Sequence, residues 1–135
     1  MKTKISLSII GAFNLIQSTA MLLFADKILT KMKIINPDGL SNADCAENVF
    51  RICEVMHYGL APALLIIGLI LILSRNAELK TAKNILLGYI IGVCVLMYVF
   101  FGILASEPLL NFDPTHVIPD IAMLLIAVYT YFKAK

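Results

Sequence analysis

Three ionisable side chains near the start of a long apolar segment are the residues best able to do chemistry. Arg51, Glu54 and His57 follow one another at intervals of three within residues 48–74. In a helix this spacing places them along one slowly drifting stripe. Charged groups are costly inside a membrane and need partners there. The stripe is therefore expected to face other helices and not lipid.

Polar residues from all four apolar segments fall at a similar predicted depth. A rise of about 1.5 Å per residue from the outer helix ends puts five of them roughly 8 to 13 Å inside the membrane. A polar layer of this kind predicts a ligand pocket that opens outward. Its members are Gln17, Glu54, His57, Tyr98 and Asp120, with Arg51 and His116 nearer the outer surface.

Three interpretations of this polar layer stay open. It is an internal lock, in which Arg51 pairs with Glu54 or Asp120 and a histidine completes the hydrogen bonds; or it binds a ligand; or it catalyses a reaction. Glu54, His57 and Asp120 are the candidate catalytic groups. Contact between Glu54 and Asp120 requires the second and fourth membrane spans to lie side by side.

No spacing in the chain identifies a cofactor. His57 and His116 are the two histidines, and with Glu54 and Asp120 they offer suitable ligand types without a diagnostic metal spacing. No metal site is predicted, and the cofactor stays unknown. The cysteines also lack metal-type spacing and are expected to be free thiols. They are Cys45, Cys53 and Cys94.

The composition is that of an integral membrane protein. Of 135 residues, 60% are hydrophobic and 15% charged, and the mean hydropathy is +0.89. An ordinary soluble domain is far more polar. The net charge of +2 comes from scattered lysines, so nucleic acid is not an expected partner. We expect residues 1–135 to form a single membrane domain in contact with the lipid bilayer.

Four apolar segments are long enough to cross the roughly 30 Å hydrocarbon core of a bilayer. They are residues 5–24, 49–73, 84–105 and 114–132. Short connections favour antiparallel neighbours, so the predicted fold is an all-α, four-transmembrane-helix antiparallel bundle. A signal peptide ending near Ser18-Thr19-Ala20 is the alternative for the first segment, although its apolar run continues beyond that point.

Local signals refine these helices. Asn14 and Gln17 share a face that is expected to turn inward, because an amide needs a partner in hydrocarbon. Residues 26–35 are expected to prolong the first helix into the head-group region, where lysine side chains reach water. Gly88 and Gly92 predict a close helix contact. Before the last span, Asp113-Pro114 reads as N-cap and first helical residue, and Pro119 is expected to kink the helix near its start.

The distribution of basic residues predicts the orientation. The side that holds both termini collects seven lysines and arginines, and the opposite side has four. By the positive-inside rule, both termini are expected to be cytoplasmic. The expected location is the cell membrane, with several passes.

The layout resembles that of a known family. An arginine near the start of the second span precedes a glycine-bearing apolar run, a short basic loop, a glycine-rich third span and a fourth span. The matching residues are Asn48, Arg51, Gly59 and Gly68. Over most of its length the chain resembles the DoxX-like group of small four-helix bacterial membrane proteins. For some members the resemblance implies a link to quinone or redox membrane complexes; Glu54 and His57 are additions to the pattern.

The residues together predict a binding or accessory membrane protein. The expected ligand of the outward-facing pocket is a hydrophobic small molecule, lipid-like or quinone-like. A second copy of the chain and a larger membrane complex are further candidate partners. The alternative functions are a membrane-embedded acid-base enzyme of the isomerase type, acting on a lipid-like substrate, and a small transporter.

Overall fold

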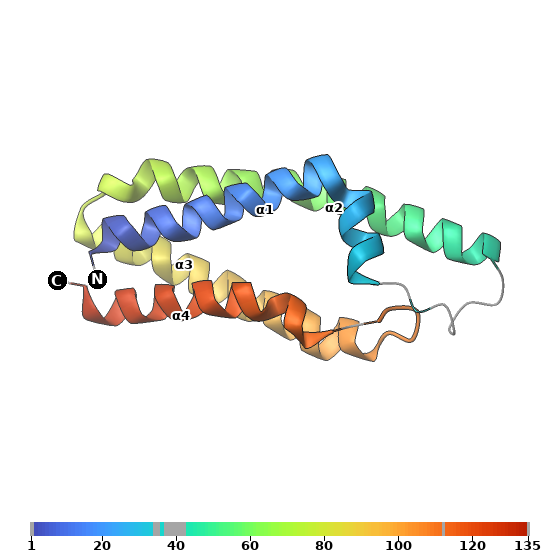
Figure 1. Ribbon diagram of the computed structural model, residues 1–135. Helices are drawn as coiled ribbons and strands as arrows, with labels where there is room; N and C mark the ends of the chain where they lie inside the picture. Colours follow the sequence, from blue (N-terminus) through green and yellow to red (C-terminus); the bar gives the residue numbers. More distant parts are fainter. Residues whose placement is uncertain (1, 34–35, 37–42, 112, 135) are drawn as a thin grey trace.

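In the part of the chain that the computed structural model describes, four long helices form an antiparallel bundle (Figure 1). They are α1 (Thr3–Met32), α2 (Ala43–Leu73), α3 (Leu79–Tyr98) and α4 (Ile118–Lys133). The structure describes residues 2–33, 36, 43–111 and 113–134, with only the backbone of residues 43–46. α1 begins and α4 ends at the same end of the bundle. The predicted all-α, four-helix fold is confirmed.

Each of these helices, taken with the short helical turns beside it, is long and apolar enough to cross a membrane. The suitable stretches, which include short helical turns next to α3 and α4, are Thr3–Met32, Glu47–Asn76, Leu79–Ser106 and Pro114–Lys133. Each stretch contains the whole of the corresponding predicted span. The length and composition of the helices thus support a multi-pass membrane protein.

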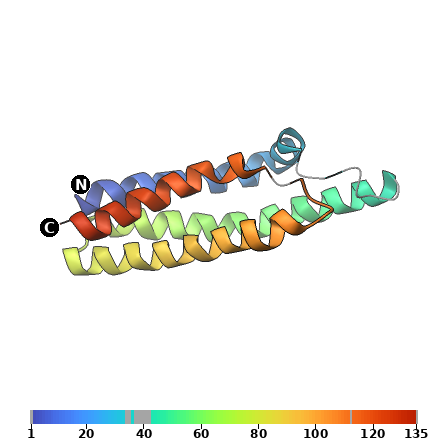
Figure 2. The same ribbon diagram turned by 90° about the horizontal axis from the view of Figure 1, so that it is seen from below.

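α1 extends past the first predicted span and bends there. At Phe24 the backbone leaves helical geometry, with φ −138° and ψ 27°. The part of α1 beyond this kink turns away from the line of the helix, as Figures 1 and 2 show. The Lys27 ammonium lies 5.5 Å from the centre of the Phe24 ring, a cation–π contact. The predicted extension of the first helix is confirmed as far as Met32.

Two glycines fix the register of α1 against α2. A Cβ atom on Gly11 would lie 2.6 Å from Ile72 Cγ1 and 3.0 Å from the carbonyl oxygen of Gly68. The absence of a side chain therefore allows the two helices to approach closely here. The Ser18 hydroxyl donates a 2.7 Å hydrogen bond to the carbonyl oxygen of Ala61. Because the helices are antiparallel, each step forward along α1 corresponds to one step back along α2.

α4 packs against α1 and α3. Where α1 meets α4, the buried hydroxyls of Ser6 and Thr130 lie 2.6 Å apart and share a hydrogen bond. A buried apolar cluster near this end of the bundle draws on all four helices. It consists of Leu7, Ile10, Leu71, Ala82, Leu86 and Ala127.

A short 3-10 helix, η5 (Pro114–Val117), leads into α4. The Asp113 carboxylate accepts a 2.9 Å hydrogen bond from the backbone N–H of Thr115, so the predicted N-cap is confirmed. This hydrogen bond holds the pKa of Asp113 below its ordinary value of 3.8. Pro119 lies in the first turn of α4, where the helix changes from 3-10 to α geometry. It begins an element and does not kink the interior of one, because a proline at this position removes no helical hydrogen bond.

Candidate functional site

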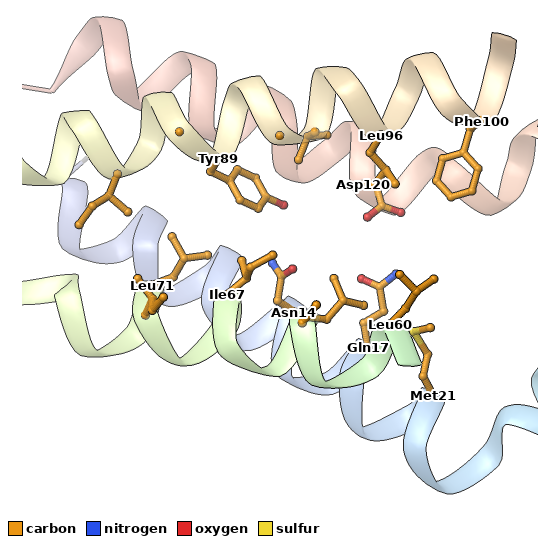
Figure 3. Close-up of a pocket in the computed structure, with 17 residues that line it drawn as sticks. Asn14, Gln17, Met21, Leu60, Ile67, Leu71, Tyr89, Leu96, Phe100 and Asp120 are labelled. Atoms are coloured by element: carbon orange, nitrogen blue, oxygen red, sulfur yellow. The ribbon is translucent and has the colours of Figure 1, made fainter. Parts of the chain in front are cut away.

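A cavity of about 490 Å³ lies between the α1–α2 pair and the α3–α4 pair (Figure 3). Its walls are mostly apolar. Leu60 and Ile67 of α2 line one side, and Leu96 lines the α3 side. Phe100 closes one end from a π-helical segment, Val99–Ile103, that follows α3. The cavity thus combines apolar walls contributed by facing helices with the size of a small-molecule site.

Four polar side chains reach this cavity, one or two from each of three helices. They are Asn14 and Gln17 of α1, Tyr89 of α3 and Asp120 of α4. Asn14 is 3% exposed, and its amide nitrogen donates a 2.8 Å hydrogen bond to the carbonyl oxygen of Ile10 in its own helix. The Gln17 Oε1 atom is buried and has no hydrogen-bond partner. A buried acceptor without a donor is costly, and a ligand donor would remove that cost.

The Asp120 carboxylate points into the cavity from the first turn of α4 (Figure 3). The residue is half-buried. Among the described residues it forms no ion pair and no hydrogen bond to another side chain; only its own backbone N–H is within reach. Its position near the N-terminal end of α4 favours negative charge through the helix dipole. The site therefore presents an unpaired acid to whatever occupies the cavity.

Gly88 and Gly92 form part of the α3 wall. A Cβ atom built on either glycine would meet nothing within 4 Å, and both glycines line the cavity. The prediction that this pair makes a close helix contact is wrong. The close contact is made by Gly11 and Gly68 instead, and the Gly88/Gly92 face of α3 borders the cavity, which a larger side chain would enter.

At the cavity, the structure brings two of the predicted site residues together. Gln17 and Asp120 face each other across the cavity (Figure 3). The common depth of these two residues follows from the packing of α1 against α4. Ser6 lies opposite Thr130, so eleven residues forward along α1 from Ser6 and ten back along α4 from Thr130 reach the same level.

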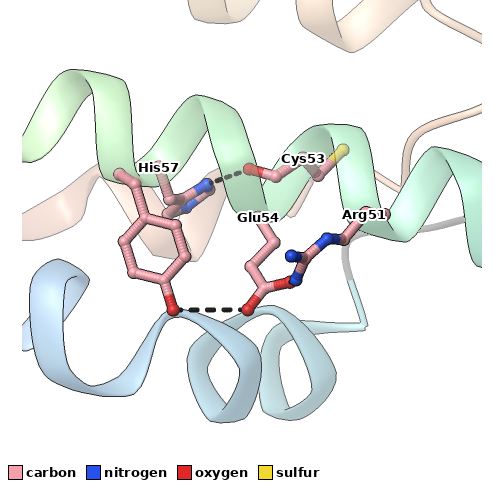
Figure 4. Close-up of polar contacts among 5 residues, drawn as sticks. Arg51, Cys53, Glu54 and His57 are labelled. Carbon is pink, nitrogen blue, oxygen red and sulfur yellow. Dashed lines mark hydrogen bonds and ion pairs between the residues drawn. The ribbon is translucent and has the colours of Figure 1, made fainter.

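Arg51, Glu54 and His57 lie outside this cavity. Arg51 pairs with Glu54 on the same face of α2, and the Tyr58 hydroxyl donates a 3.3 Å hydrogen bond to Glu54 (Figure 4). The Arg51 side chain is 71% exposed, against 12% for Glu54. His57 Nδ1 lies 2.9 Å from the carbonyl oxygen of Cys53. All these contacts are local to α2, so they do not lock one helix to another.

Tyr98 and His116 are also separate from the cavity lining. Tyr98 is 70% exposed on the outside of α3. His116 is half-buried in η5, one turn before Asp120. Cys53 and Cys94 are free thiols, in agreement with the expectation. The side chain of Cys45 lies outside the described residues.

The register of α2 against α1 explains why Glu54 does not lie at the level of Asp120. Ser18 lies opposite Ala61. Seven residues later on α1 and seven residues earlier on α2, Ala25 lies level with Glu54, beyond the Phe24 kink. The level of Gln17 on α2 is occupied by apolar residues such as Leu60. The predicted depths were counted from residues 24 and 49, whereas α1 continues to Met32 and α2 begins at Ala43.

Contact between Glu54 and Asp120 required the second and fourth spans to lie side by side, and this condition is not met. In the described part of the chain, α4 packs chiefly against α1 and α3, while α2 packs chiefly against α1. A carboxylate pair between Glu54 and Asp120 therefore does not form. Asp120 instead faces Gln17 of α1 across the cavity, because α1 packs against α4.

Sequence reasoning missed one polar residue of the cavity. The prediction that the side chains of Asn14 and Gln17 face the inside of the bundle is confirmed, because both line the cavity. Tyr89 was not singled out, although it lies inside the predicted apolar span 84–105. A hydroxyl at that depth needs a hydrogen-bonding partner. This signal, together with the neighbouring Gly88, would have placed Tyr89 on the inner face of α3.

The arrangement does not assemble a metal site among the described residues. They contain no group of three or more histidine, cysteine, aspartate or glutamate side chains that could hold a metal ion. Comparison with protein-family models, curated proteins and solved structures finds no match. The resemblance to the DoxX-like group therefore stays a prediction.

Proposed function

We propose that this protein is a small integral membrane protein whose bundle binds a lipid-soluble, amphipathic small molecule. The observation that carries the proposal is the cavity of about 490 Å³ between the two helix pairs. Ligand sites of roughly 300 to 1,000 Å³ are typical for small molecules. The ligand's apolar body lies along α2 and α3, and its polar end lies beside Gln17 and Asp120.

The chemistry of the lining supports binding more than acid-base catalysis. A proton-transfer reaction needs an acid and a base in reach of the same substrate. Glu54 and His57 lie elsewhere on α2, so Asp120 has neither of the expected catalytic partners. Tyr89 and the two amides offer hydrogen bonds that would orient a bound molecule. An accessory role in a membrane complex is compatible with the same site.

Ligand-dependent stabilisation tests the proposal. The probe is 1-adamantanol, a compact apolar body with one hydroxyl, added to the purified protein in detergent. A ligand that binds the folded state at 100 times its Kd stabilises it by about 2.7 kcal/mol, so the Tm of the wild type should rise with probe concentration and saturate.

A matched pair of glycine variants gives the control. Gly92→Leu places a side chain in the cavity, so it should abolish the saturable rise in Tm. Gly59→Leu makes the same change on α2. Gly59 does not line the cavity, and a Cβ atom built on it would meet nothing within 4 Å. This variant should therefore keep the saturable rise in Tm. An equal rise in Tm for both variants would show that the probe acts through the detergent and would end the proposal.

A further inference from the structure

Two hydrogen-bond acceptors dominate the polar end of the cavity. The Asp120 carboxylate and the Gln17 side chain face each other across it (Figure 3). Gln17 Oε1 is buried without a partner, and Asp120 forms no ion pair among the described residues. Two acceptors of this kind are satisfied together by a group with at least two donors. A ketone or an ether supplies none, and a single hydroxyl supplies one.

The charge of Asp120 points in the same direction. Its surroundings in the cavity are apolar or neutral: Leu60 and Leu96 on the walls, Phe100 at one end, and Asn14 and Tyr89 further along. In the described part of the chain, Arg51 forms an ion pair with Glu54 and lies outside the cavity. An unpaired charge inside a membrane is expensive and needs a partner. The cavity itself leaves space for that partner.

We infer that the polar group of the bound molecule is a protonated amine or a related organic cation with N–H donors. Its ammonium pairs with Asp120 and donates a second hydrogen bond to Gln17 Oε1. Its apolar body lies against Ile67 and the open Gly88/Gly92 face of α3. This inference rests on the proposed binding function and adds the ligand class: an amphipathic amine.

Three probes with one adamantyl body and different polar groups test the inference. They are 1-adamantylamine, 1-adamantanol and adamantane-1-carboxylate, each compared with the filled-cavity variant Gly92→Leu to remove the effect of partitioning into detergent. At pH 7 the amine should bind the wild type at least about tenfold more tightly than the alcohol, a difference of roughly 1.4 kcal/mol. The carboxylate should bind most weakly, since like charges repel.

Removal of the charge at Asp120 should remove this preference. In Asp120→Asn the ratio of amine to alcohol affinity should fall to about one. The control Asp113→Asn makes the same change at the exposed N-cap and should keep the wild-type ratio. Gln17→Leu provides a second test, because it removes the other acceptor and should also lower the ratio.

The outcomes separate this inference from the function on which it rests. If no probe raises the Tm of the wild type by more than it raises the Tm of Gly92→Leu, the proposed binding function fails. If the alcohol or the carboxylate binds the wild type as tightly as the amine, binding stands and the amine class is wrong. An amine preference that survives in Asp120→Asn would equally overturn the assignment.

Discussion

At the scale of single residues, the polar end of the cavity combines groups that the sequence marks as costly in a membrane. Gln17 and Asp120 were both identifiable because an amide or a carboxylate in an apolar span requires a partner. The same reasoning selected Arg51 and Glu54, whose partners proved to be each other. Residue type therefore marks a group that needs a partner. Arg51 and Glu54, three apart on α2, supply each other's, whereas Gln17 Oε1 has no partner among the described residues.

The Asp113 cap should make part of the stability depend on pH. Its carboxylate accepts a hydrogen bond from Thr115 N–H, which lowers the pKa of Asp113 below 3.8 in the folded state. The carboxylate therefore stabilises the fold above its unfolded-state pKa, and this stabilisation is lost as pH falls through the lower folded-state pKa. The Tm of Asp113→Ala should be below that of the wild type at neutral pH, and the difference should shrink in acid.

Tm measurements across the acidic range check this prediction. Asp113→Asn is the control, because asparagine caps a helix but does not titrate. It should keep most of the wild-type Tm at neutral pH. A Tm difference between the wild type and Asp113→Ala that is unchanged well below pH 3.8 would show that the cap charge does not contribute.

At the scale of helices, the glycine contact between α1 and α2 should be intolerant of a methyl group. A Cβ atom on Gly68 would lie 2.9 Å from the Leu15 side chain and 3.0 Å from the carbonyl oxygen of Gly11. Overpacking of this kind costs about 1 to 3 kcal/mol. Gly68→Ala should therefore lower the free energy of unfolding, measured by denaturant titration in detergent.

Gly59→Ala is the matched control on the same helix. No atom would lie within 4 Å of its new Cβ, and alanine favours a helix over glycine by up to about 1 kcal/mol. This variant should be neutral or slightly more stable than the wild type. Equal losses in the two variants would mean that glycine matters for another reason than close packing.

The hydrogen bond between α1 and α4 should give a measurable coupling energy. Ser6 and Thr130 share a buried 2.6 Å contact. Hydrogen bonds between membrane helices contribute about 0.6 kcal/mol on average and up to about 1.7. A double-mutant cycle with Ser6→Ala and Thr130→Val should give a coupling in this range. Thr19→Val should show no coupling to Thr130→Val, since Thr19 bonds to Leu15 within α1.

At the scale of the whole molecule, the distribution of lysine and arginine predicts the orientation in the membrane. With both termini cytoplasmic, a fluorescent protein fused after Lys135 should fold and fluoresce. In this orientation the loop between α3 and α4 would lie outside, so alkaline phosphatase inserted after Pro108 should be active. An active phosphatase at the C-terminus, together with an inactive one at Pro108, would reverse the predicted orientation.

Hydropathy and spacing were sufficient to predict the fold. For the site, they predicted the cavity residues Gln17 and Asp120 but also included Arg51, Glu54 and His57, which lie outside the cavity. The four spans and the N-cap at Asp113 follow from local signals in the sequence. Which helices pack against one another does not follow from such signals. Glu54 was predicted at the depth of Asp120 because depth was counted from predicted helix ends, whereas the Gly11–Gly68 contact sets the register. Such a contact between distant residues cannot be read from spacing within either helix.

Fluorescence quenching at one position tests the central claim that the cavity binds a small molecule. The chain has no tryptophan, so Phe100→Trp places a single reporter at the end of the cavity. Leu125→Trp is the control on α4, at a side chain that is 64% exposed and outside the lining. The heavy-atom quencher is 3-bromo-1-adamantanol.

Quenching of Phe100→Trp should saturate with quencher concentration and should lose its saturable part when Gly92→Leu is added. Quenching of Leu125→Trp should rise in proportion to the quencher and show no saturation. This pattern is the result expected of a ligand site between the helix pairs. Quenching of the two reporters that is equal and without saturation would contradict the proposal that the cavity is a binding site.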